Sequence, residues 1–165
     1  MEPCRSLALL TGSLALTCVL VALGTDFWFV ALGPTSSAHS GLWPNGDQHA
    51  VAGYIRVTQT FNILATLCGL VSLVLLVLSC VPSLSAPGQG PLVSSITAFV
   101  AALCMMVAMA VYTGERWSQP QEPQIQTFFS WSFYLGWVSI PLLLSAGGLS
   151  LVAHCHGPRP GYDTL

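Results

Sequence analysis

Lysine is absent from this chain of 165 residues, and its four basic side chains are all arginines. Charged residues make up only 6% of the sequence, against about 25% in an average soluble domain. Hydrophobic residues make up 53%. So few charges could not cover the surface of a water-soluble protein of this length, and we expect lipid to solvate most of the chain.

Charge is also absent from four long apolar runs, the first of which is Leu7–Leu23. The predicted spans are about residues 7–27, 61–81, 92–113 and 131–153. Each is close to the roughly 20 residues that a helix needs to cross a hydrocarbon core about 30 Å thick. The runs do not alternate like barrel strands, and backbone groups in lipid must be satisfied internally. The sequence therefore predicts an all-α transmembrane fold, a left-handed four-helix bundle.

A cleaved signal peptide is the competing interpretation of the first run. Arg5 precedes it, and Ala22-Leu23-Gly24 offers small residues at which a protease could cut. The run is longer than a usual signal core, and apolar residues continue through Val30. These features favour a first membrane span.

The loops organise the chain as one four-span membrane domain over residues 1–165. A long first loop at 25–60 and a second at 114–130 lie on one side of the membrane. A turn rich in proline and glycine at 82–91 lies on the other side, with both termini and the tail at 154–165.

Basic charge does not orient these spans. Arg5 and Arg159 flank one side, and Arg56 and Arg116 flank the other, so the positive-inside rule gives a tie. Neither long loop contains an Asn-x-Ser/Thr site for glycosylation. The orientation must come from another feature.

The chain ends in Gly161-Tyr162-Asp163-Thr164-Leu165. A tyrosine, two spacers and a bulky aliphatic residue form an extended peptide that can add to the edge of an adaptor's sheet. The motif resembles the tyrosine-based sorting signals of lysosomal membrane proteins. Tyr162 and Leu165 are therefore predicted to bind a clathrin adaptor, which places both termini in the cytosol.

Several segments resemble the peripheral myelin protein, epithelial membrane protein and claudin superfamily. Trp28 is followed by Gly41-Leu42-Trp43, and both match that family's first loop. Residues 57–64 and 132–137 are similar to the starts of its second and fourth spans. The resemblance covers nearly the whole chain. It implies a small claudin-like β cap from the first loop, with Trp28, Gly41, Leu42 and Trp43 as its signature.

The family signature continues with a pair of bridging cysteines that this sequence lacks. No cysteine lies between Asp26 and Arg56. Removing such a disulfide from a small element typically costs about 2–5 kcal/mol. Other contacts must therefore hold the first loop.

Within the family, the segments together with the tail are similar to a member found in cytotoxic lymphocytes. That resemblance implies a place in the membrane of the cytolytic, lysosome-related granule, and at the plasma membrane after degranulation. It also implies a part in granule exocytosis and killing, through lipid and other granule membrane proteins. A claudin-like adhesion protein and an auxiliary subunit of a channel or pump are the alternatives.

Enzymatic function has no support in the sequence. None of the four apolar runs contains a charged residue, whereas intramembrane proton relays and transport paths usually need one. Short motifs of metalloproteases and phosphate-binding loops are absent. His154-Cys155-His156 has no convincing fourth ligand for a zinc ion. We expect no enzyme, no metal, no other cofactor and no nucleic-acid partner.

Three cysteines stand at the predicted cytosolic ends of the spans, and all are candidates for S-palmitoylation: Cys4, Cys80 and Cys155. The tryptophans mostly fall near predicted membrane interfaces, where their amphipathic rings prefer to lie. Anchoring in the interface is the role predicted for them. They are Trp28, Trp43, Trp117, Trp131 and Trp137.

Overall fold

A computed structural model describes residues 3–43, 52–81, 83 and 89–157. Over these residues the chain forms four helices and three strands: α1 (Pro3–Gly24), β1 (Phe29–Leu32), β2 (Ser37–Ser40), α2 (Gly53–Cys80), α3 (Gly90–Ser118), β3 (Gln126–Phe129) and α4 (Trp131–Cys155). All four helices are long and apolar enough to cross a membrane. The predicted four-helix transmembrane fold is confirmed.

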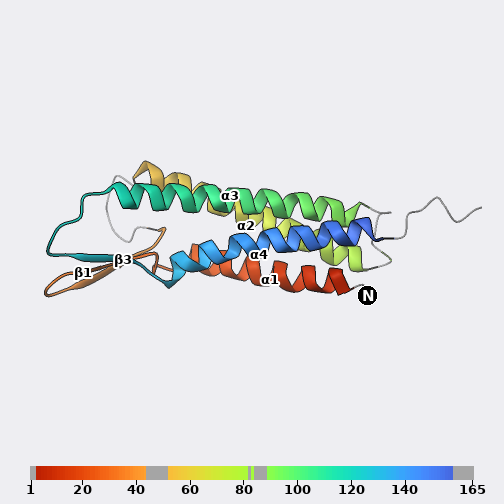
Figure 1. Cartoon of the computed structure of the whole chain (residues 1–165), viewed down its shortest axis with the longest axis horizontal. Helices are drawn as coiled ribbons and strands as arrows, with labels where there is room; N and C mark the ends of the chain where they lie inside the picture. Colours follow the sequence, from red (N-terminus) through yellow and green to blue (C-terminus); the bar gives the residue numbers. More distant parts are fainter. Residues whose placement is uncertain (1–2, 44–51, 82, 84–88, 158–165) are drawn as a thin grey trace, which may run out of the picture.

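The helices lie side by side along the long axis of the molecule (Figure 1). α2 packs on α3, α1 on α4, and α3 on α4, while α1 and α2 pack less closely. The strands lie at one end of the bundle. The first helix begins, and the last helix ends, at the opposite end (Figure 1).

Many of the buried residues inside the bundle are small, and many large apolar side chains lie on its outside. Ala15, Ala102 and Ala108 are buried, while Leu10 and Leu103 are more than half exposed. Lipid tails are as apolar as leucine, so no hydrophobic effect draws large side chains inward. Close approach of helix backbones at small residues stabilises the bundle instead.

Polar contacts at three levels fix the antiparallel register of α2 and α3. At the sheet end, the rings of Tyr54 and Tyr112 lie 6.2 Å apart. Further along, Thr58 Oγ1 is 3.5 Å from the Ala108 carbonyl. Nearer the other end, Ser72 and Ser94 each donate a hydroxyl hydrogen bond of 2.8 Å to the other's carbonyl. From one contact to the next, the residue number on α2 rises by as much as the residue number on α3 falls.

The helices extend beyond the apolar spans expected from hydropathy. α2 begins at Gly53 rather than at residue 61, and α3 continues to Ser118 rather than to 113. The added turns carry Gln59 and Arg116, which contact Leu42 and Phe29 of the first loop. α1 instead ends at Gly24, short of residue 27, because the chain turns there to bury Trp28.

A three-stranded antiparallel sheet in the order β2-β1-β3 caps the bundle. In the register, Phe29 lies opposite Ser40 of β2 and Phe129 of β3. β3 belongs to the second loop, so the cap expected from the first loop alone takes two strands from the first loop and one from the second. The central strand, β1, therefore ties the two loops together.

Asn62 is an unpaired polar group in the core. Its side chain on α2 is fully buried, and neither Nδ2 nor Oδ1 has a hydrogen-bond partner among the described residues. An unsatisfied buried group costs about 1–3 kcal/mol. Asn62→Leu is therefore expected to raise the free energy of unfolding by about 1 kcal/mol or more, measured by thermal unfolding in detergent micelles.

Gln59 provides the matched control one turn away on the same helix. Its Nε2 donates a hydrogen bond of 2.7 Å to the Leu42 carbonyl, so Gln59→Leu is expected to lower the free energy of unfolding. A loss of stability in Asn62→Leu would mean that the buried amide has a partner after all.

Candidate functional site

The end of α1 under the sheet is where the predicted signature residues meet. The last four carbonyls of any helix lack partners within that helix. In α1, Thr25 Oγ1 donates to the Val21 carbonyl at 2.7 Å. The Trp28 indole Nε1 donates to the Ala22 carbonyl at 2.6 Å, in a buried setting. Side chains thus replace water as hydrogen-bond donors to the carbonyls at this helix end.

Trp43 completes this cap from the far end of the first loop. Its indole Nε1 donates to the Leu23 carbonyl at 2.8 Å. Three of the last four carbonyls of α1 therefore accept a side-chain hydrogen bond from the segment that follows. Both tryptophans of the signature act as donors, because an indole N–H reaches a carbonyl while its ring remains in apolar surroundings.

Gly41 and Leu42 fix the path of the loop between these tryptophans. A Cβ on Gly41 would lie 2.5 Å from the Asp26 Cα and 2.9 Å from the Thr25 carbonyl oxygen. Only glycine allows this approach of two backbone segments. Leu42 is fully buried, and its carbonyl accepts the Gln59 hydrogen bond. The loop is thereby held to both α1 and α2.

An aromatic cluster fills the space between the sheet and the bundle. Trp28 packs edge-on against Tyr112 of α3, with ring centroids 4.9 Å apart. Phe133 of α4 stacks on Phe129 of β3 at 4.1 Å. The Trp28 backbone also joins both neighbouring segments, accepting from Ser130 N at 3.0 Å and donating to the Ser40 carbonyl at 3.1 Å.

Arg116 closes the cluster from the end of α3. Its guanidinium carbon lies 4.4 Å from the centre of the Phe29 ring and 5.6 Å from that of Tyr112. Nη2 is 3.5 Å from Ser40 Oγ. A guanidinium stacks on aromatic faces and is weakly hydrated, so it can lie there half-buried. Arg116 clamps the sheet to α3.

The prediction that the tryptophans serve as interfacial anchors is wrong for Trp28. It is fully buried in the protein core, because its indole caps α1 and its ring packs on Tyr112. The others are exposed over 37–78% of their surface. Hydropathy alone cannot separate a tryptophan at the membrane boundary from one that is folded beneath a cap.

Sequence reasoning missed Tyr112, Arg116 and Gln59 as parts of this junction. Nothing in the local sequence around them marks a contact with the first loop. Arg116 offered one signal, since a basic residue at the end of a span can pack on aromatic rings. The arrangement positions the sheet on the bundle.

Aromatic rings are exposed at the edge of the cap beside α4. The Phe27 ring stacks between His39, at 4.6 Å, and Trp131, at 5.7 Å. Phe128 and Tyr134 are also about half exposed nearby in the chain. These side chains are available to lipid or to another protein.

The remaining predicted site residues belong to the opposite end of the bundle. Cys4 and Cys80 are half-buried and Cys155 is exposed. They lie in the first turn of α1 and the last turns of α2 and α4. Tyr162 and Leu165 lie outside the described residues, so the adaptor-binding motif stays a sequence prediction.

The sequence of this chain is similar to those of several known proteins. Residues 6–150 match the PMP-22/EMP/MP20/Claudin family. Protein NKG7 of Homo sapiens is 70% identical over all 165 residues of both chains, and that of Mus musculus is 67% identical over the same length. The Lens fiber membrane intrinsic protein of Homo sapiens is 30% identical over 144 residues, which are 82% of this chain and 83% of that protein. The resemblance to this family that was predicted from the sequence is confirmed.

Proposed function

The chain belongs to the PMP-22/EMP/MP20/Claudin family, and from this we propose that it is a non-enzymatic membrane protein of lysosome-related cytotoxic granules. It supports granule trafficking and exocytosis, and so lymphocyte cytotoxicity. It works through contacts with lipid and other membrane proteins of the granule. After degranulation it reaches the plasma membrane.

The observation that carries this proposal is the tail sequence GYDTL. α4 ends at Cys155, and Tyr162 follows seven residues later. α1 begins and α4 ends at the same end of the bundle (Figure 1), and four spans would leave both chain ends on one side of the membrane. A tail of this length leaves Tyr162 and Leu165 within reach of an adaptor at the cytosolic surface, where an extended peptide can add to a sheet edge.

The cysteines at the same end fit this orientation. Cys155 is exposed and Cys4 is partly so, and each lies in a terminal turn of its helix. Thiols at the cytosolic boundary of a span are substrates for reversible S-palmitoylation. We assign Cys4, Cys80 and Cys155 this role. The sheet and its aromatic junction then face the granule lumen.

Tyr162→Ala tests the sorting signal. A tagged wild-type chain in cytotoxic lymphocytes is expected in granules, and the variant is expected to accumulate at the plasma membrane at several times the wild-type surface level. The adaptor pocket loses its aromatic anchor while the membrane fold is untouched. Imaging with a granule marker, and surface labelling of an epitope in the first loop, measure the shift.

Thr164→Ala is the matched control, because this spacer lies between the two anchor positions. Its distribution is expected to equal that of the wild type. Surface residence of the wild type and both variants alike would contradict the granule proposal.

A claudin-like adhesion protein is the second candidate. The exposed stack of Phe27, His39 and Trp131 at the edge of the cap favours it, since such side chains can meet a protein on a facing membrane. This function predicts enrichment of the tagged chain at cell contacts. It also predicts no effect of Tyr162→Ala on that enrichment.

A further inference from the structure

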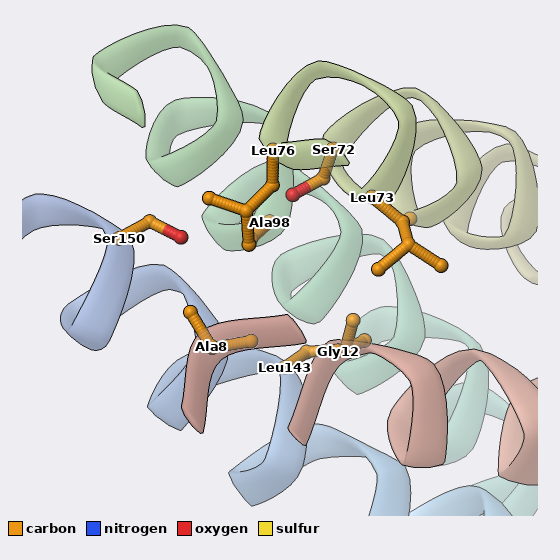
Figure 2. A pocket seen from close by; sticks show the side chains of 10 residues that line it. Ala8, Gly12, Ser72, Leu73, Leu76, Ala98, Leu143 and Ser150 are labelled. Carbon is orange, nitrogen blue, oxygen red and sulfur yellow. The ribbon is translucent and has the colours of Figure 1, made fainter. Parts of the chain in front are cut away.

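A small internal cavity lies between the four helices, in the half of the bundle away from the sheet. Its wall includes Ala8 and Gly12 of α1, Ser72 and Leu76 of α2, and Leu143 and Ser150 of α4 (Figure 2). Ala98 of α3 lies behind them (Figure 2). The free space holds about one water molecule, which is too little for a lipid chain.

The hydroxyl of Ser150 points into this cavity (Figure 2). The residue is only 1% exposed, and its oxygen points toward the space between the helices (Figure 2). Other serines of α4 bond to their own helix, since Ser145 Oγ donates to the Pro141 carbonyl at 2.7 Å and Ser139 Oγ to the Gly136 carbonyl at 2.6 Å. Within the part of the chain that the structure describes, Ser150 Oγ makes no such bond. A hydroxyl that borders a cavity and has no hydrogen bond within the protein is expected to bond a ligand in that cavity.

Ser72 offers an acceptor on the α2 side of the same cavity. Its hydroxyl proton is used, because Ser72 Oγ donates to the Ser94 carbonyl at 2.8 Å. Ser94 Oγ in turn donates to the Ser72 carbonyl at 2.8 Å. Ser72 Oγ also lies 3.0 Å from Ser94 Oγ, and because a hydroxyl oxygen has two lone pairs, Ser72 Oγ keeps at least one of them to accept another hydrogen bond. The cavity therefore has one donor and one acceptor on two different helices.

We propose that the cavity binds a single water molecule, which accepts a hydrogen bond from the Ser150 hydroxyl and donates one to Ser72 Oγ. Water is the ligand that fits, since a buried water needs two to four polar partners and about this much room. The rest of the wall is apolar, which keeps the water at the two hydroxyls.

The water joins two helices that stand diagonally in the bundle. Ser72 and Ser94 link α2 to α3, and Ser95 Oγ links α3 to α4 through the Gly147 carbonyl at 2.8 Å. A bridge from Ser150 to Ser72 connects α4 back to α2. Three helices are then held by one polar layer, in the half of the bundle where α4 ends.

Ser150→Ala tests this site in the full-length chain in detergent micelles, because the Tm is expected to fall if the water is bound and not to fall if it is absent. If the hydroxyl holds water, its removal is expected to lower the Tm by about 2–4 °C. If the hydroxyl is unpaired, its removal relieves an unsatisfied group and the Tm rises or stays unchanged. That result would overturn the proposal. Ser145→Ala, whose hydroxyl bonds only its own helix at an exposed position, is the control with no expected shift.

A double-mutant cycle with Ser72→Ala identifies the bridge. Ser72→Ala alone also breaks the bond to Ser94, but that loss occurs in both arms of the cycle and cancels. The two substitutions remove the same water, so the double variant is expected to lose less Tm than the two single losses added together. Strictly additive losses would mean that no water joins Ser72 to Ser150, and would overturn the proposal.

Discussion

Trp28→Ala is expected to lower the free energy of unfolding by about 3–5 kcal/mol, the usual cost of truncating a large buried aromatic residue. Trp28 is fully buried, packs on Tyr112 and Phe133, and donates to the α1 carbonyl of Ala22. Its loss leaves a cavity under the sheet and removes one of the three side-chain hydrogen bonds that cap α1. Because total stabilities are about 5–15 kcal/mol, thermal unfolding in detergent should show a large fall in Tm.

Two further variants separate the ring from its N–H group. Trp28→Phe keeps much of the packing but removes the donor, and is expected to cost about 1–3 kcal/mol. Trp117→Ala removes a side chain that is 78% exposed and is expected to change stability little. Equal effects of Trp28→Ala and Trp117→Ala would contradict the buried position of Trp28.

Gly41→Ala is the second substitution with a large expected effect. The added Cβ would lie 2.5 Å from the Asp26 Cα and 2.6 Å from its Oδ1. The nearest atoms include backbone, so the chain must shift rather than a flexible side chain. We expect a loss of about 2–3 kcal/mol, together with faster hydrogen exchange at the Trp28 amide. That amide bonds to the Ser40 carbonyl, next to Gly41.

Gly114→Ala provides a control of opposite sign. Gly114 lies inside α3, and a Cβ there meets nothing within 4 Å. Alanine is the better helix former, so this variant is expected to gain about 0.5–1 kcal/mol. The idea that Gly41 permits a backbone contact fails if Gly41→Ala is as stable as the wild type.

Much of this fold follows from local composition. The spans could be predicted because lipid imposes one requirement on each run, that of length without charge. Cys80 and Cys155 could be placed at helix ends for the same reason. Such inferences need no knowledge of which helix neighbours which.

The junction under the sheet could not be predicted in this way. Phe29 pairs with Phe129 across a hundred residues of chain, and strands of four residues carry too short a pattern to reveal a partner. Tyr54 lies in a polar segment that the sequence predicts to be loop. In the structure it belongs to α2, and its ring packs on that of Tyr112. The family resemblance pointed to Trp28 and Gly41–Leu42–Trp43. Only the folded structure shows that the two tryptophans donate hydrogen bonds to the end of α1 and that Gly41 allows two backbone segments to approach.

The hydrogen bonds that hold the first loop to α1 have a consequence for the conditions in which the cap stays folded. All six cysteines lie within the described residues and all are free thiols. The loop is held instead by indole, hydroxyl and amide donors on backbone carbonyls. None of these groups exchanges electrons with a thiol reductant. The fold of the cap is therefore independent of the redox potential of the compartment, and the chain can pass between oxidising and reducing surroundings without opening it.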